Sequence, residues 1–282
     1  MTSQKQAHPP ADAAEAPPLP ADGHVHTEYS WDASRGDMAA TCARALDLGL
    51  PGIVITEHSD FVHAFQEQRP LDVAGYAEAV ERCRQRFPDL KILLGVEVGE
   101  PHWFPDEVRR LLEQASFDRV LGSVHCVGSP ENAIDWSQSM PVAPNPAERM
   151  RLHLAETLKL IESDAPFHVF AHLDYPKRYW PKAAAAYDET EHEEQYRAVL
   201  RAAARRGSVL EVNSTRGMAP ATGLCPGPLP LKWWREEGGE AVAFGSDAHS
   251  PDALAKGFEH ARHVVEAAGF KPAKDPLDFW RR

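Results

Sequence analysis

Hydrophobic residues in this chain alternate between short buried runs and segments of helical spacing. Residues 52–56 form a run rich in β-branched side chains, as expected for a strand that is buried on both faces. Before it, apolar residues recur at helical spacing over residues 38–48, and Gly49-Leu50-Pro51 ends that segment. The same alternation continues along the chain and predicts seven strands with helices between them.

The strands are expected at residues 22–25, 52–56, 91–98, 119–124, 168–171, 208–212 and 241–244. The helices are expected at residues 38–48, 73–87, 105–114, 147–162, 189–206, 231–237 and 254–268, with Pro-rich or Gly-rich loops over 128–146 and 217–230. This alternation predicts an α/β fold with a parallel sheet and helical crossovers. A closed barrel and an open doubly wound sheet both satisfy it, but the chain has no glycine-rich phosphate loop of the kind that favours the open sheet.

Length and composition narrow the class of protein. The 282 residues suit a single barrel domain over residues 21–282, and the Ala/Pro-rich residues 1–20 are expected to be a disordered tail. The formal net charge of -12 argues against a general affinity for nucleic acid or anionic membranes. The four cysteines lack CxxC spacing, and no apolar run is long enough to span a bilayer. We therefore expect a cytoplasmic protein with no membrane partner.

Side chains that can bind metals stand at the ends of nearly all the expected strands. They are His24, His26, His58, Glu97, His125, His172, Asp247 and His249, with Asp32 in the loop after the first pair. The remaining histidines fall mostly on expected helices or in the tail. Since the carboxyl ends of barrel strands meet at one mouth, these nine side chains are expected to converge. Mixed imidazole and carboxylate ligands suit zinc, manganese or iron, and nine are too many for one ion, so two to three divalent ions are predicted.

The motifs that carry these residues also have a characteristic order. They are His24-Val25-His26-Thr27, Ser30-Trp31-Asp32, Thr56-Glu57-His58-Ser59-Asp60, Gly95-Val96-Glu97, the segment 117–125, Ala171-His172 and Gly245-Ser246-Asp247-Ala248-His249. From about residue 21 to about residue 265, this order resembles the successive motifs of the PHP (polymerase and histidinol phosphatase) superfamily, most closely the histidinol-phosphatase branch. The resemblance implies a distorted, TIM-like (β/α)7 barrel with a trinuclear metal site at the carboxyl ends of the strands.

The resemblance also implies how the ligands are shared among three ions. His24, His26, Glu97 and Asp247 would hold the first ion, and Glu97 would bridge to a second ion bound by His125 and His172. Asp32, His58 and His249 would hold the third. Asp247, Glu97 and His249 are the candidate catalytic residues, with Asp247 as a candidate proton shuttle to the leaving alcohol.

The implied activity is that of a metal-dependent phosphatase. The substrate would be a small phosphate ester, best represented by L-histidinol phosphate, which yields L-histidinol and phosphate in histidine biosynthesis. Arg216, just past the sixth strand, and Lys177 and Arg178, just past His172, are candidate phosphate-binding residues because cationic side chains, and guanidinium forks above all, suit phosphate oxygens.

Two loops depart from the family pattern and leave the substrate open. The segment from Glu211 to Arg216 is shorter by two residues before the arginine than is usual in the family, and residues 128–146 lack the usual long insertion. A PHP-type phosphodiesterase or exonuclease acting on nucleotides is therefore the alternative. A non-catalytic PHP module would need missing ligands, and all nine positions are filled. An amidohydrolase barrel would carry a metal-bridging lysine at a strand end, where this sequence has none.

Overall fold

Seven parallel strands form the centre of the fold in the computed structural model, which describes residues 18–63, 69–214 and 223–282. The strands are β1 (Asp22–Val25), β2 (Gly52–Ser59), β3 (Lys91–Gly99), β4 (Arg119–Ser123), β7 (Val169–Phe170), β8 (Val209–Asn213) and β9 (Ala241–Gly245). They pair in that order, each parallel to its neighbour. An eighth strand that the sequence did not predict, β10 (Trp280–Arg281), pairs antiparallel with β9.

The sheet curls until its first strand meets the segment that follows β9. The amide of His26 donates to the carbonyl oxygen of Ala248 at 2.8 Å, and the amide of Asp247 donates to the carbonyl oxygen of His24 at 2.8 Å. The carboxylate of Asp22 strengthens this seam, because it accepts the amides of Ser246 at 2.9 Å and Ala255 at 3.0 Å. The expectation of a distorted barrel of parallel strands is confirmed.

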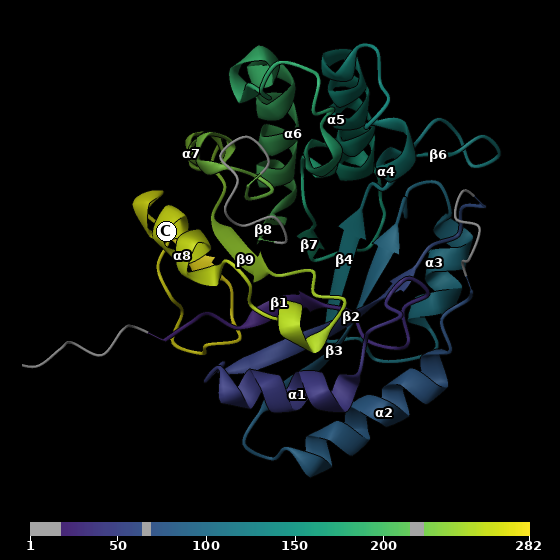
Figure 1. Ribbon diagram of the computed structural model, residues 1–282, viewed down its shortest axis with the longest axis vertical. Helices are drawn as coiled ribbons and strands as arrows, with labels where there is room; N and C mark the ends of the chain where they lie inside the picture. Colours follow the sequence, from purple (N-terminus) through teal and green to yellow (C-terminus); the bar gives the residue numbers. More distant parts are fainter. Residues whose placement is uncertain (1–17, 64–68, 215–222) are drawn as a thin grey trace, which may run out of the picture.

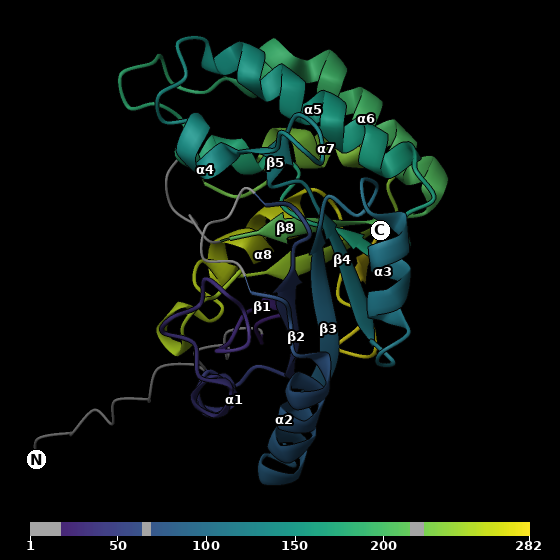
Figure 2. The same ribbon diagram turned by 90° about the vertical axis from the view of Figure 1, so that its right-hand side faces the viewer.

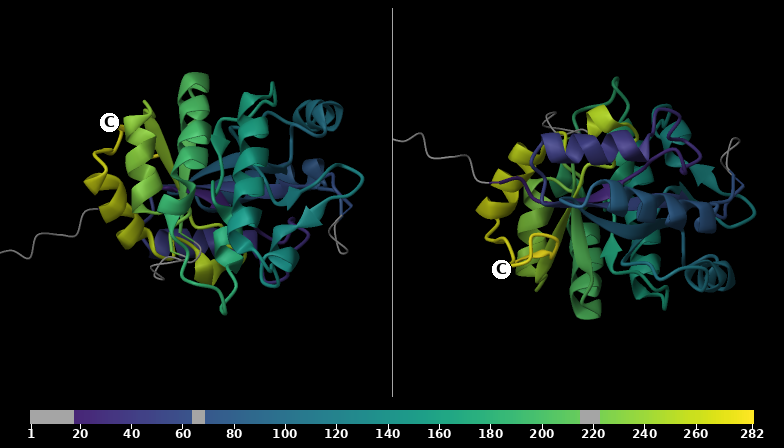
Figure 3. Two further views of the ribbon diagram at one scale, coloured as in Figure 1. Left: turned by 90° about the horizontal axis from the view of Figure 1, so that it is seen from above. Right: turned by 90° about the horizontal axis from the view of Figure 1, so that it is seen from below.

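Helices cover the sheet on the outside (Figures 1 and 2). They are α1 (Met38–Asp47), α2 (Val73–Arg86), α3 (Pro105–Leu112), α5 (Pro146–Glu162), α6 (Glu193–Arg206), α7 (Pro228–Glu236) and α8 (Phe258–Ala267). Seen from above and below, they surround the strands, and α5 and α6 lie side by side (Figure 3). Within the described ranges, no helix has the length and apolar character needed to cross a membrane.

Strand β2 is longer than expected and is buried along its whole length. The sequence predicted that it would end at Thr56, but the strand continues through Ser59 because these residues pair with β3. In this register His58 lies directly opposite Glu97. The extension therefore places two expected metal ligands side by side on neighbouring strands.

Some element boundaries differ from the prediction. Residues 128–146, expected to be a loop, contain the strand β6 (Ile134–Asp135), which pairs with β5 (Cys126–Val127), and the short helix α4 (Trp136–Ser139), whose Trp136 side chain is fully buried. Helix α7 begins at Pro228, before the expected start at residue 231, because proline is tolerated in the first turn, where the amides have no partner within the helix. Helices α6 and α8 begin at residues 193 and 258, later than the expected starts at residues 189 and 254. Each is preceded by a short 3-10 turn, η2 (Glu189–His192) before α6 and η3 (Pro251–Ala253) before α8.

Candidate metal centre

All nine expected ligands lie together at the carboxyl ends of the strands. His24 comes from β1, His58 from β2 and Glu97 from β3, and the others stand in the segments that follow β1, β4, β7 and β9. Most of these side chains are buried, whereas Asp32 and His249 are about one third exposed, at 30% and 31%. The cluster therefore extends from the interior of the barrel to its solvent edge.

Glu97 lies at the centre of the cluster and is fully buried. Five imidazoles surround its two oxygens: His24 Nε2 (3.1 Å), His26 Nε2 (3.3 Å) and His58 Nδ1 (3.2 Å) around Oε2, and His172 Nε2 (2.8 Å) and His125 Nε2 (3.3 Å) around Oε1. Each oxygen thus faces its own group of imidazoles. A carboxylate in this position has the geometry to bridge two cations.

Two further carboxylates continue the cluster toward solvent. Asp247 Oδ1 lies 3.3 Å from His26 Nε2, and Asp32 Oδ2 lies 3.0 Å from His249 Nε2 and 3.5 Å from His58 Nε2. Four overlapping trios have ligand atoms within 4.8 Å of one another: His26, His58 and His249; His24, His26 and Glu97; His24, His172 and Asp247; and His58, Glu97 and His125. The residues therefore form one continuous cluster. The three ligand sets implied by the family resemblance lie within it and are not separated in space.

The charges in the cluster fit bound cations. Burial alone would lower the pKa of His58, but the carboxylates of Asp32 and Glu97 raise that pKa to about 10. Burial alone would raise the pKa of Glu97, but the surrounding imidazoles hold that pKa well below its usual range. The buried carboxylates thus favour positive charge among them strongly enough to hold protons on histidines. Divalent cations bound to neutral imidazoles would supply the same charge, so the donor set fits the metal centre expected from the sequence.

Side chains behind the cluster hold the rings of three candidate ligands in place. The Nδ1–H of His24 donates to Glu211 Oε1 at 2.6 Å, and the Nδ1–H of His26 donates to Ser30 Oγ at 3.0 Å. His125 Nδ1 lies 3.3 Å from Asp60 Oδ1. These contacts leave Nε2 of each ring facing the cluster, as second-layer carboxylates do in metal sites.

These supporting residues were not predicted from the sequence, although one signal for them was present. In β8, Glu211 and Asn213 alternate with the apolar Leu210 and Val212. Alternate residues of a strand point to the same face, so two polar residues in an otherwise apolar buried strand indicate a polar interior at that level of the barrel. The face shared by Glu211 and Asn213 could therefore have been predicted to point toward the cluster.

A cavity of about 320 Å³ opens over the cluster. It is lined by Asp32, His58, His125, Tyr175, Arg178, Tyr179, Asp247 and His249. Three of these residues belong to one 3-10 turn, η1 (Tyr175–Tyr179). The Arg178 guanidinium in this turn donates to Asp247 Oδ2 at 2.7 Å and to Asn213 Oδ1 at 2.6 Å, and its side chain is only 5% exposed. The cavity thus joins the candidate metal ligands to a fixed cationic fork.

The other two candidate phosphate-binding residues have different positions. Lys177 does not line this cavity: its Nζ lies 2.7 Å from Asp174 Oδ2 and 3.3 Å from Glu189 Oε1, and the side chain is buried. Arg216 lies outside the described residues. Within the described part of the chain, Arg178 is thus the one candidate of the three that reaches the cavity.

Two of the candidate ligands have an unusual backbone conformation. Asp247 has φ 55° and His172 has φ 25°, both in the left-handed region that favours glycine. For other residues such a conformation costs on the order of 1–3 kcal/mol, and it persists where the surrounding structure imposes it. Both residues follow the end of a barrel strand, so the strain lies at the site itself.

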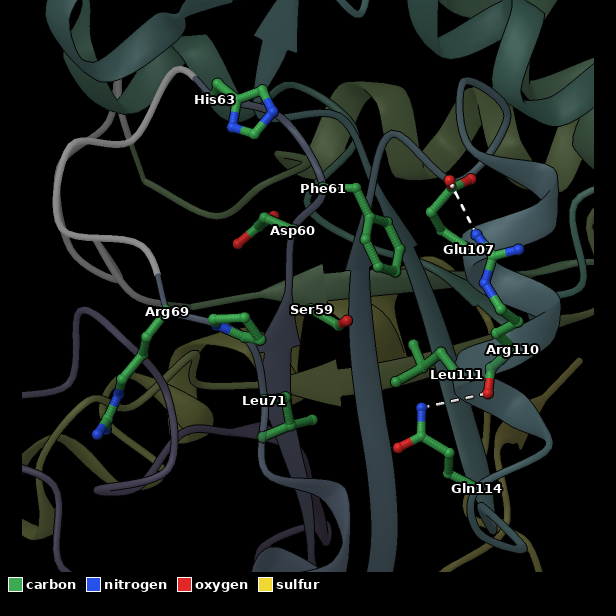
Figure 4. A pocket seen from close by; sticks show the side chains of 11 residues that line it. Ser59, Asp60, Phe61, His63, Arg69, Leu71, Glu107, Arg110, Leu111 and Gln114 are labelled. Carbon is green, nitrogen blue, oxygen red and sulfur yellow. Dashed lines mark hydrogen bonds and ion pairs between the residues drawn. The ribbon is translucent and has the colours of Figure 1, made fainter.

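A second cavity, of about 500 Å³, lies between the end of β2 and α3 (Figure 4). Its walls include the apolar side chains of Phe61, Leu71 and Leu111, and none of the nine expected ligands lines it. Asp60 separates it from the cluster, since this carboxylate lines the cavity and also contacts His125. The chemistry therefore belongs to the smaller cavity over the cluster.

A curled parallel sheet that carries a buried cluster of histidines and carboxylates at its carboxyl ends defines a metal-dependent hydrolase. The PHP domain family matches residues 22–215, which is more than half of the chain. The chain therefore belongs to the PHP family, and it is a metal-dependent phosphatase similar to histidinol-phosphatases.

Curated relatives match this chain over most of its length. The histidinol-phosphatase of Lactococcus lactis subsp. lactis (strain IL1403) is 28% identical over 88% of this chain and 91% of its own length. A probable histidinol-phosphatase of Clostridium acetobutylicum is 27% identical over 89% of this chain and 94% of its own length. The crystal structure of the Lactococcus lactis histidinol phosphate phosphatase, in complex with zinc, L-histidinol and phosphate, superposes with a TM-score of 0.82 at 25% identity, covering 93% of this chain and 98% of that one.

Proposed function

We propose that this protein hydrolyses a small phosphomonoester, and that its substrate is L-histidinol phosphate, which is converted to L-histidinol and inorganic phosphate in histidine biosynthesis. The observation that carries the proposal is the cavity of about 320 Å³, in which candidate metal ligands and the Arg178 guanidinium face one another. Its volume suits a phosphate with a small alcohol. The zinc, L-histidinol and phosphate bound to the Lactococcus lactis relative support the same substrate class.

We assign the nine clustered residues as ligands of two to three divalent ions, either zinc, manganese or iron. Glu97 is the bridging ligand because its two oxygens face separate groups of imidazoles. Asp32, His58 and His249 form the part of the cluster nearest to solvent. When bound, the ions would neutralise a phosphate dianion and supply hydroxide near neutral pH.

The protein's own side chains orient the substrate in this proposal. Arg178 lines the cavity wall, where Asp247 and Asn213 hold its guanidinium in place, and a guanidinium suits phosphate oxygens. Asp247 contacts that guanidinium and the imidazole of His26, and we keep it as the candidate that passes a proton to the leaving oxygen. Tyr175 and Tyr179, whose hydroxyls lie 3.1 Å apart, form part of the wall of the same cavity.

The test is a substrate panel with the purified full chain. Phosphomonoesters, including L-histidinol phosphate, and phosphodiesters are compared with zinc, manganese and iron added separately, and the metal content is measured for each preparation. We expect two to three ions per chain and the highest kcat/KM with L-histidinol phosphate. Preference for a diester or a nucleotide, or no hydrolysis by the fully loaded protein, would refute the proposed substrate. One ion or none after metal-replete expression would refute the assigned centre.

Glu211→Gln is expected to weaken metal binding about 10-fold to 100-fold, as is typical for the loss of a carboxylate behind a ligating imidazole. The neutral amide accepts a weaker hydrogen bond from His24 Nδ1–H and holds that ring less firmly. Competition with a chromogenic chelator measures the affinity. The control is Glu78→Gln, which changes a carboxylate whose side chain is 77% exposed on α2. Equal metal affinity in both variants would show that Glu211 does not support the centre.

A further inference from the structure

A buried ion pair lies behind the turn η1, on the side away from the cavity. The Lys177 ammonium lies 2.7 Å from Asp174 Oδ2 and donates to the carbonyl oxygen of Leu224 at 2.9 Å. It also lies 3.3 Å from Glu189 Oε1. Lys177 is 2% exposed and Asp174 is fully buried. These contacts of the ammonium are thus made inside the protein.

Two tyrosines extend this pair to the neighbouring helix. The Tyr196 hydroxyl, on α6, donates to Asp174 Oδ2 at 2.7 Å, and the Tyr187 and Tyr196 hydroxyls lie 2.7 Å apart. Both tyrosines are buried. The network therefore fastens η1 to α6, to the segment around Leu224 and to the 3-10 turn that contains Glu189.

Lys177 and Arg178 are neighbours in the chain with different surroundings. Consecutive residues of a 3-10 helix point about 120° apart, because each turn contains three residues. Arg178 lines the cavity, whereas Lys177 enters the buried network. A shift of the turn at Lys177 would therefore move the Arg178 guanidinium.

Burying a lysine costs free energy unless the charge is paired and hydrogen-bonded. Lys177 meets both conditions, and among the described residues none of its partners belongs to the metal-ligating cluster or lines the cavity. Neither the metal centre nor phosphate contact accounts for this arrangement. Lys177 stands directly before Arg178 in the chain, so the buried network bears on the position of that guanidinium.

We propose that Lys177 is a positioning residue, whose ion pair with Asp174 fixes η1 so that Arg178 meets the substrate phosphate. The inference rests on the proposed function, because it takes Arg178 as the phosphate donor. It assigns Lys177 a role different from the direct phosphate contact expected from the sequence. Arg178 also bonds Asp247 and Asn213, so losing Lys177 misplaces the guanidinium without removing it.

A double-mutant cycle tests this role. Lys177→Met keeps an unbranched side chain, one atom shorter than lysine, and removes its charge. It is combined with Arg178→Ala in the metal-loaded full chain. We expect Lys177→Met alone to lower kcat/KM about tenfold and to weaken the binding of inorganic phosphate similarly, with the metal content unchanged. In the Arg178→Ala background, Lys177→Met should change kcat/KM and phosphate affinity less than twofold. The effects of two substitutions do not add when both residues act through the same guanidinium.

Two further variants make the cycle interpretable. Lys177→Met combined with Asp174→Asn removes both buried charges and replaces the single variant if an unpaired Asp174 prevents folding. Lys232→Met is the matched control, since this lysine side chain is 69% exposed on α7. We expect the charge-free pair to lose phosphate affinity as Lys177→Met does, and the control to match the parent protein.

The possible outcomes separate the inference from the proposed function. If Arg178→Ala impairs catalysis and Lys177→Met impairs it equally in both backgrounds, Lys177 acts on stability alone and the positioning role is refuted. If Arg178→Ala changes neither phosphate affinity nor kcat/KM, the phosphate role of Arg178 is refuted and the positioning role with it. Binding of inorganic phosphate requires no turnover, so this readout remains valid even if L-histidinol phosphate is not the substrate.

Discussion

Glu97→Gln is expected to abolish phosphatase activity and metal loading together. Five imidazoles converge on the two oxygens of Glu97, and a glutamine amide offers one neutral oxygen and an NH2 group that repels a cation. We expect kcat/KM to fall at least about a thousandfold, which corresponds to about 4 kcal/mol of transition-state stabilisation. Elemental analysis and steady-state kinetics on the same preparation measure the two effects.

Glu78→Gln, an exposed change of the same chemistry, serves as the control and should keep full activity and metal content. Near-ultraviolet circular dichroism shows whether the Glu97→Gln variant keeps its tertiary packing. A folded Glu97→Gln protein with full metal occupancy would rule out the bridging position. Full occupancy without activity would place Glu97 in catalysis and not in metal binding.

Arg178→Ala is expected to lower kcat/KM about 100-fold to 1000-fold, or about 3–4 kcal/mol, with the metal content unchanged. This is the range for the loss of one preorganised donor to a developing charge. The guanidinium is held at the cavity wall by Asp247 and Asn213, so the parent protein spends little free energy on orienting it during the reaction. Arg178→Lys should recover only part of the loss, because an ammonium cannot form the fork.

Arg110→Ala is the control for this variant, because its side chain is 63% exposed and lies on α3, away from the cavity over the cluster. Hydrolysis by Arg178→Ala at the parent rate would show that Arg178 does not hold the phosphate. Arg216, expected from the sequence, would then be the candidate donor. A diester substrate, with a single negative charge on its phosphate, would be the other explanation.

The sequence predicted the barrel and its nine converging residues because both depend on local patterns. Alternating apolar runs locate the strands, and parallel strands bring their carboxyl ends to one edge. His58 and Glu97 could be placed together on this rule before their register was known. A histidine at a strand end therefore predicts more about position than a histidine on a helix, such as His153 on α5.

The remaining features depend on contacts between distant segments. Lys177 and Arg178 are equivalent on grounds of charge, and only the packing of α6 against η1 shows that one is buried in a network and the other lines the cavity. The contact between His125 and Asp60 has no local signature either. The positive φ of Asp247 opposes local preference, so a method based on propensity cannot predict it.

The seam of the barrel has a consequence for the order of events in the cell. Asp22 accepts the amides of Ser246 and Ala255, which lie 224 and 233 positions later in the chain. Across the same seam His24 lies beside Asp247, and it also lies beside Glu97 of β3. A ribosome must therefore synthesise the chain through His249 before the centre has its full set of ligands. Nascent chains can begin to fold from the N-terminal end, but complete metal acquisition must follow translation of the last parallel strand.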